Sequence, residues 1–120
     1  PVLGHITTFG GHPVCCAAGL AAMKVLLEEK IIDAIKEKEE SFKSLLVHKK
    51  INAIRSFGLW MAVEFDSFET NKKVIDTCIK SGVMTDWYLF APNCMRISPP
   101  LMISKKEISK ACEIILSSVS

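Results

Sequence analysis

Residues 51–65 read INAIRSFGLWMAVEF, two short runs of strand-like composition that are divided by Gly58. Two such runs around a single glycine are typical of an antiparallel β-hairpin, sometimes with a bulge. Two more strands are expected at residues 83–87 and 93–98, and the last one stops at Pro99 because proline has no N–H to donate to a ladder. These runs together predict a short, mainly antiparallel sheet.

The region before the hairpin has helical patterns. Pro13 suits the first position of a helix, and residues 14–29 continue as a stretch rich in Ala, Gly and Cys that is apolar nearly all round. Such a helix is expected to pack on several faces against neighbours that a chain of this size can hardly supply. An amphipathic helical stretch continues from Ile31, with a kink or short break near residues 28–30.

Two more helices follow the hairpin. Gly82 is expected to end the first of them as its left-handed cap. Ser104 and Glu107 form a capping box at the start of the second, whose apolar residues recur at helical spacing up to Val119. This order of elements indicates an α+β fold, with a small antiparallel sheet covered on one face by helices and preceded by a long helix.

The composition is that of a folded protein with one domain. Of 120 residues, 49% are hydrophobic and 23% are charged, and the net charge of +2 excludes a strongly basic nucleic-acid-binding stripe. The longest apolar run, residues 14–23, is shorter than the ~20 residues that span a bilayer. Residues 1–12 lack the apolar core of a signal peptide, so a cytoplasmic protein without nucleic-acid or membrane partners is expected.

Two features suggest a piece of a larger protein. The mean hydropathy of +0.28 is high for so small a chain, and the sequence starts at Pro1 within a patterned segment. We therefore expect apolar faces that missing parts of the protein cover.

The cysteines do not predict a disulfide framework or a zinc ribbon, because their number is odd and none are spaced as C-x2-C: Cys15, Cys16, Cys78, Cys94 and Cys112. Reduced thiols in the core are expected instead. His12 and Cys16 could supply two metal ligands, but Cys15 points about 100° away on a helix and a structural zinc needs four ligands. A metal site is not expected.

Residues 7–13 read TTFGGHP and form the first candidate site. Two hydroxyls, glycine N–H groups and a following helix N-terminus suit a phosphate. The alternative is an ordinary turn whose hydroxyls cap the helix, and the spacing alone favours that alternative.

Arg96 is the second candidate, because it interrupts an otherwise apolar strand just before Pro99. Its side chain either extends into solvent or grips a carboxylate through two parallel hydrogen bonds, and the pattern leaves both interpretations open. Arg55 has a similar setting beside a turn, which favours a structural role there.

Three segments carry a family resemblance. Residues 5–13, HITTFGGHP, are similar to the motif H-G-[ST]-T-[FY]-G-G-N-P; residues 54–60, IRSFGLW, to [IV]-R-G-x-G-L-[ML]; and residues 96–103, RISPPLMI, to R-[LIF]-x-P-P-L-x-I. The chain thus resembles the C-terminal segment of a class III pyridoxal-phosphate (PLP) aminotransferase of the ornithine/acetylornithine group. It departs from the motifs where Ile6 and Ser56 replace glycine and His12 replaces asparagine.

The resemblance implies the small C-terminal domain of a fold-type I PLP enzyme, in which a missing N-terminal large domain carries the catalytic lysine. Residues 1–120 are then a single fragment, with a phosphate-contacting loop at 1–13, a helical segment at 14–50 and an α+β small domain at 51–120. A homodimer is implied as well.

The resemblance also assigns roles to residues. Thr8, assisted by Thr7, contacts the phosphate of the PLP bound by the partner subunit, and Arg96 holds a substrate carboxylate. The reaction implied is transfer of an amino group between an amino acid and a keto acid, and the fragment alone is expected to be inactive. The alternative is a free-standing α+β interaction or regulatory domain without catalysis.

Overall fold

The computed structural model describes residues 7–119, and the chain divides into two compact units, Pro1–Ile32 and Asp33–Ser120. In the first unit, helix α1 spans Pro13–Glu28 and begins with proline at its first turn, as the sequence predicted. This helix buries no side chain, and apolar residues such as Leu20 and Met23 are more than half exposed. Cover for α1 by further protein stays a prediction, as does the functional division of the chain at residues 13 and 50.

The expected break after α1 is confirmed. Glu29 ends the helix, and Lys30 adopts a left-handed backbone conformation with a φ of 50°. A short 3-10 helix, η1 (Ile31–Ala34), then leads into α2 (Ile35–Leu45), which is amphipathic as expected.

The sheet of the second unit has four strands in the order β1-β2-β4-β3, and all neighbours are antiparallel. The predicted hairpin is present as β1 (Ala53–Phe57) and β2 (Trp60–Glu64), with Gly58 at a φ of 60° in its turn. The other two strands are β3 (Asp86–Tyr88) and β4 (Ala91–Ile97).

Strand β3 begins three residues later than the sequence predicted. The reason lies in the end of helix α3 (Phe68–Lys80), because the N–H of Val83 donates to the carbonyl of Cys78 at 2.8 Å. The residues after Gly82 therefore complete the helix cap and join the sheet only at Asp86.

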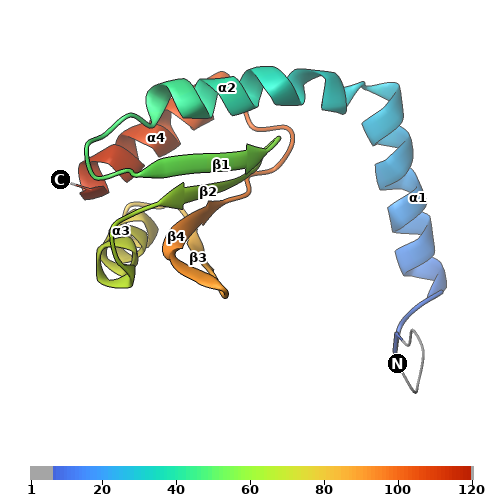
Figure 1. Cartoon of the computed structure of the whole chain (residues 1–120). Helices are drawn as coiled ribbons and strands as arrows, with labels where there is room; N and C mark the ends of the chain where they lie inside the picture. Colours follow the sequence, from blue (N-terminus) through green and yellow to red (C-terminus); the bar gives the residue numbers. More distant parts are fainter. Residues whose placement is uncertain (1–6, 120) are drawn as a thin grey trace. The chain divides into compact units, whose positions relative to one another are not determined.

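The helices of this unit lie against one face of the sheet (Figure 1). Alternate residues of the strands turn to that face and are buried, among them Met61, Val63, Met95 and Ile97. They pack with side chains of α2, α3 and α4 (Lys105–Val119) to form one core. The fold is therefore α+β, with a short antiparallel sheet covered by helices, as predicted.

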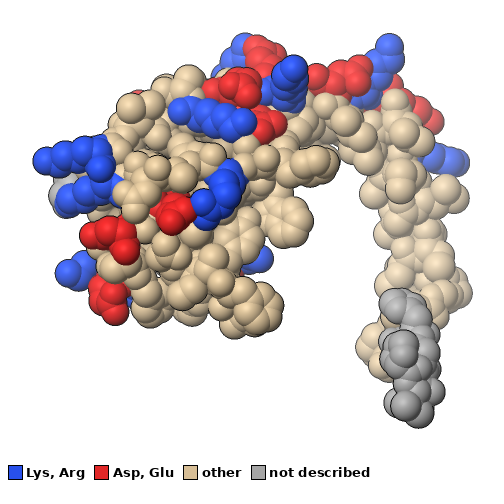
Figure 2. Space-filling view, viewed as in Figure 1, with Lys and Arg blue, Asp and Glu red and all other residues tan. Residues whose placement is uncertain are grey.

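Polar contacts fix the helix ends and their surfaces. In the predicted capping box, the Ser104 N–H donates to Glu107 Oε2 at 2.8 Å and the Glu107 N–H donates to Ser104 Oγ at 3.3 Å. The Ser104 hydroxyl, which donates to Glu107 Oε2 at 2.7 Å, and then the Ser104 N–H lower the pKa of the Glu107 carboxyl. Lys105 Nζ lies 2.5 Å from Glu37 Oε1 and links α4 to α2. On the face that Figure 2 presents, basic and acidic side chains are intermingled.

The five cysteines are free thiols, but they do not share one environment. Cys78 and Cys112 lie in the core, where burial raises the pKa of the Cys112 thiol to about 11. Cys94 is also buried, on the opposite side of the sheet from the core cluster. Cys15 and Cys16 are exposed, so the prediction of core thiols is wrong for this pair, because α1 has no cover within the described residues.

Replacing Gly82 with alanine is expected to destabilise this unit by roughly 1–2 kcal/mol, because Gly82 holds a φ of 87° and its N–H donates to the carbonyl of Ile79. An added Cβ meets no atom within 4 Å, so the loss comes from the backbone alone. Native-state hydrogen exchange of the α3 amides measures it. Ser81→Ala, in the same turn at a φ of −92°, is the control and should be nearly neutral; equal losses for both variants would contradict the explanation.

Candidate functional site

The loop before α1 is a tight turn that presents two hydroxyls. The N–H of Gly10 donates to the Thr7 carbonyl at 3.5 Å, and the N–H of His12 donates to the Phe9 carbonyl at 3.2 Å. A Cβ on Gly10 would overlap Thr7 Oγ1, so a larger residue there would require the Thr7 side chain to move. Thr7 and Thr8 are both exposed. The part of the motif over residues 1–6 lies outside the described residues.

The N-terminus of α1 has no side-chain cap. His12 occupies the N-cap position without a side-chain hydrogen bond, and the first turn contains no acidic residue. The alternative in which the threonine hydroxyls cap the helix is therefore wrong for the described residues. The first helical hydrogen bond runs from the Cys16 N–H to the His12 carbonyl at 2.9 Å, so the N–H groups of Val14 and Cys15 precede the helical ladder. Uncapped N–H groups, the positive end of a helix and two hydroxyls fit a phosphate group.

Arg96 lies on the face of the sheet that the helices leave open. The register pairs Arg96 of β4 with Ala62 of β2 on one side and with Asp86 of β3 on the other. Arg96 Nη2 lies 2.5 Å from Asp86 Oδ2, and Thr85 Oγ1 donates to the Arg96 carbonyl at 2.5 Å. Asp86 thus holds one edge of the guanidinium, whose other N–H groups have no partner among residues 7–119.

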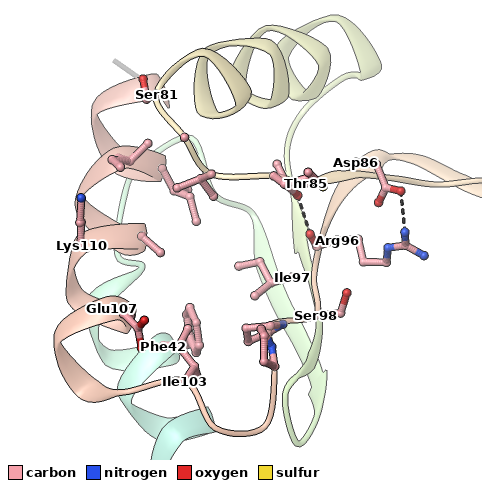
Figure 3. A pocket seen from close by; sticks show the side chains of 18 of the residues that line it. Phe42, Ser81, Thr85, Asp86, Arg96, Ile97, Ser98, Ile103, Glu107 and Lys110 are labelled. Carbon is pink, nitrogen blue, oxygen red and sulfur yellow. Dashed lines mark hydrogen bonds and ion pairs between the residues drawn. The ribbon is translucent and has the colours of Figure 1, made fainter.

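A cavity of about 820 Å³ lies on the other side of this segment, between α4, α2 and residues 81–86. Phe42, Ile97 and Ile103 form much of its apolar lining, and Figure 3 shows the Arg96 side chain directed away from it, toward Asp86. Arg96 is thus one of the residues that line this cavity, but its guanidinium is directed toward the open face of the sheet.

A second, shallower pocket of about 510 Å³ lies on the open face itself, and Arg96 and Arg55 both line it. Arg55 Nη1 is 2.5 Å from Glu64 Oε2, and Arg55 Nη2 donates to Cys94 Sγ at 3.3 Å. The Glu64 carboxylate raises the pKa of the Arg55 guanidinium. Arg55 thus has the cross-strand partners that suit a structural role.

Two aromatic residues on this face were not identified from the sequence. The rings of Trp60 and Tyr88 lie 6.4 Å apart, and the Tyr88 hydroxyl donates to the Met61 carbonyl at 3.2 Å. Burial raises the pKa of the Tyr88 phenol, whereas the charge of nearby Arg96 acts to lower it. The position of Trp60 could have been predicted from the sequence. Side chains alternate between the two faces of a strand, so Trp60 lies on the same face as Ala62, which pairs with Arg96.

The predicted site residues divide between the two units. Thr7 and Thr8 belong to the unit Pro1–Ile32, and Arg96 belongs to the unit Asp33–Ser120. Within residues 7–119 no group of three or more His, Cys, Asp or Glu side chains could hold a metal ion.

Comparisons with known proteins identify the family. The sequence model of the class III aminotransferases matches residues 1–119. The chain is 32% identical to an ornithine aminotransferase of Emericella nidulans and 28% identical to an acetylornithine aminotransferase of Synechocystis, in each case over 97% of this chain. It covers 27% and 28% of those two proteins. The chain therefore belongs to the class III aminotransferase family and spans less than a third of the length of these relatives.

Solved structures agree with this assignment. An ornithine aminotransferase from Toxoplasma gondii, whose active site is partly occupied by PLP in the crystal, is 31% identical and superposes with a TM-score of 0.81. The match covers 96% of this chain and 28% of that one. A transaminase from the marine bacterium Virgibacillus, at 24% identity and a TM-score of 0.84, shares the fold over 98% of this chain and 30% of its own. Among the described residues, no helix is both long and apolar enough to cross a bilayer.

Proposed function

We propose that this chain is the C-terminal part of a PLP-dependent aminotransferase that moves an amino group between an amino acid and a keto acid. The family match across residues 1–119 supports the proposal most strongly. Because the matched relatives are more than three times as long, the proposal includes a large N-terminal domain with the catalytic lysine. A homodimer, which the resemblance implies, and a cytoplasmic location are part of the proposal as well. The alternative of a free-standing interaction domain is not favoured, since the relatives are aminotransferases.

The loop at residues 7–13 fits the phosphate of the cofactor. Thr7 and Thr8 are exposed hydroxyl donors, and the uncapped N-terminus of α1 adds N–H groups and a favourable dipole. When bound, PLP supplies the electron sink for bond changes at the amino carbon of the substrate. The contribution of Thr7 and Thr8 is to anchor and orient that group through its phosphate.

Arg96 supplies substrate binding in this proposal. Asp86 fixes the guanidinium through Nη2, and the remaining N–H donors can form two parallel hydrogen bonds with a carboxylate of the amino acid or keto acid. Because Asp86 acts through Arg96, it is a positioning residue. The open face of the sheet thus orients the substrate, and the chemistry belongs to the lysine and cofactor of the large domain.

Replacing Thr8 with valine in the full-length enzyme is expected to weaken PLP binding roughly tenfold, because the variant keeps the side-chain volume and loses a hydrogen bond to a charged group. Equilibrium dialysis of the cofactor-free protein against PLP measures the dissociation constant without relying on activity. Thr8→Ser keeps the hydroxyl and should bind PLP like the parent.

Two results would contradict this proposal, the first in the role of Thr8 and the second as a whole. If Thr8→Val binds PLP as tightly as the parent, the phosphate contact assigned to Thr8 is wrong. If the full-length protein binds no PLP and transaminates no amino acid, the proposed function itself fails.

A further inference from the structure

Arg96 has two carboxylates near it on the open face of the sheet. Strand pairing places four residues side by side across the sheet: Arg55, Ala62, Arg96 and Asp86. Glu64 lies on the same face as Ala62, two residues further along β2, and is therefore the diagonal neighbour of Arg96. Diagonal neighbours are within reach of a long side chain, so both Asp86 and Glu64 are potential partners of Arg96.

The structure pairs each arginine with a different carboxylate. Arg96 Nη2 lies 2.5 Å from Asp86 Oδ2 (Figure 3), whereas Arg55 Nη1 lies 2.5 Å from Glu64 Oε2. The Arg96 side chain is 44% exposed, and ion pairs with such exposure contribute little by themselves. A steric constraint on the Arg96 side chain would therefore have a large influence on which carboxylate it contacts.

The Tyr88 ring runs diagonally across the sheet. Tyr88 lies at the end of β3 and pairs with Ala91 at the start of β4. Its hydroxyl nevertheless donates to the carbonyl of Met61 in β2 at 3.2 Å, and Met61 pairs with Ile97 at the end of β4. Because β4 lies between β3 and β2, the phenol ring crosses β4, the strand that carries Arg96.

This path separates the two carboxylates. On the β3 side, the ring starts near the beginning of β4 and leaves the contact between Asp86 and Arg96 open. On the β2 side, the ring reaches Met61, whereas Glu64 pairs with Cys94, nearer the beginning of β4. The ring therefore lies between Arg96 and Glu64 and does not lie between Arg96 and Asp86.

We infer that Tyr88 is a positioning residue that holds Arg96 beside Asp86 and keeps it away from Glu64. This inference rests on the proposed function, in which the remaining N–H donors of Arg96 bind a substrate carboxylate. An Arg96 side chain that turned to Glu64 would lose its contact with Asp86 and direct its donors elsewhere. Because tight binding depends on the direction of those donors, the substrate would then bind more weakly.

Replacing Tyr88 with alanine in the full-length enzyme loaded with PLP tests this role. The keto acid is whichever the parent uses best among pyruvate, 2-oxoglutarate and 4-methyl-2-oxopentanoate. Its kcat/KM should fall roughly tenfold through a higher KM, with kcat near the parent value, because the ring positions Arg96 and takes no part in the chemistry. Tyr88→Phe keeps the ring and loses only its anchor on Met61, so its loss should be about threefold.

The decisive variant removes the competing carboxylate. In Tyr88→Ala/Glu64→Gln, the carboxylate that would attract Arg96 away from Asp86 is absent, so kcat/KM should return to nearly that of Glu64→Gln alone. A ring that only stabilises the sheet would give no such recovery. If Tyr88→Ala does not fold, the same comparison is made with Tyr88→Phe, whose threefold loss should also be recovered.

Phe57→Ala is the matched control. Phe57 is an aromatic residue on the same face of the sheet, paired with Trp60, but it does not line the pocket that contains Arg96. Its replacement should leave kcat/KM at the parent value. Equilibrium dialysis against PLP gives a readout besides activity, and every variant should bind PLP like the parent, because the phosphate contacts are assigned to Thr7 and Thr8.

The outcomes separate this inference from the function on which it rests. Parent-like kinetics in Tyr88→Ala, a loss that persists after Glu64 is replaced, or a parallel fall in PLP affinity would each overturn the role of Tyr88 while transamination persists in the parent. Failure of the parent protein to bind PLP and to transaminate any of the three keto acids would instead overturn the proposed function.

Discussion

Replacing Arg96 with lysine in the full-length enzyme is expected to lower kcat/KM for amino and keto acids roughly ten- to hundredfold, which corresponds to the ~1.5–3 kcal/mol of a hydrogen bond to a charged group. Lysine keeps the positive charge but loses the planar fork that matches a carboxylate. It also loses the geometry of the contact between Arg96 Nη2 and Asp86 Oδ2 at 2.5 Å. Steady-state kinetics with each substrate varied in turn measures the effect.

Arg55→Lys is a matched control on the same face of the sheet. Arg55 carries the same side chain and lines the same pocket, but its Nη1 is bound to Glu64 at 2.5 Å. The control should leave kcat/KM near the parent value, and neither variant should change the affinity for PLP, because the phosphate contacts are assigned to Thr7 and Thr8. Parent-like kinetics in Arg96→Lys, or loss of the cofactor instead, would contradict the carboxylate assignment.

The features that the sequence predicted correctly depend on local interactions. Gly58 marks the hairpin turn because the chain needs a positive φ there, and Gly82 ends α3 for the same reason. Ser104 and Glu107 are three residues apart, and their reciprocal hydrogen bonds form within one helical turn. Such signals are complete within a few residues, so a single sequence contains them.

The features that the sequence did not predict depend on which strands become neighbours. Asp86 reaches Arg96 only because β3 pairs with β4, and Tyr88 reaches Met61 only because its ring crosses β4. No regular spacing in the sequence predicts either the Asp86–Arg96 contact or the Tyr88–Met61 contact. The start of β3 was misplaced for a related reason, since Val83 has strand composition but completes the cap of α3.

The candidate site likewise has features that local sequence motifs predicted and features that only the fold reveals. The roles of Thr8 and Arg96 came from motifs, which are local in sequence, and they stay proposals. The structure adds the ion pair to Asp86 and the ring pair of Trp60 and Tyr88, which together describe the surroundings of Arg96. A motif identifies a residue type at a position, whereas selectivity depends on neighbours brought together by the fold.

Replacing Phe65 with alanine is expected to destabilise the unit Asp33–Ser120 by about 3–5 kcal/mol, a large fraction of the roughly 5–15 kcal/mol that stabilises a typical domain. The Phe65 side chain is fully buried in the core beside Val63. Its backbone is fixed by Asn93, whose carbonyl accepts from the Phe65 N–H at 3.0 Å and whose Nδ2 donates to the Phe65 carbonyl at 3.2 Å. Because these bonds hold the chain in place, the core is expected to relax only partly into the space left by the ring.

Phe57→Ala on the same hairpin is the matched control, because the Phe57 side chain is 89% exposed at the end of β1. Its loss should change stability by no more than about 0.5 kcal/mol, since few contacts disappear. Native-state hydrogen exchange of the β2 and β4 amides in the full-length protein measures both variants. A large loss in Phe57→Ala would mean that further protein covers the hairpin end. If Phe65→Ala loses as little stability as is expected for Phe57→Ala, the result would contradict the burial of Phe65. Removing a buried ring should leave a cavity and cost stability, whereas removing an exposed ring should not.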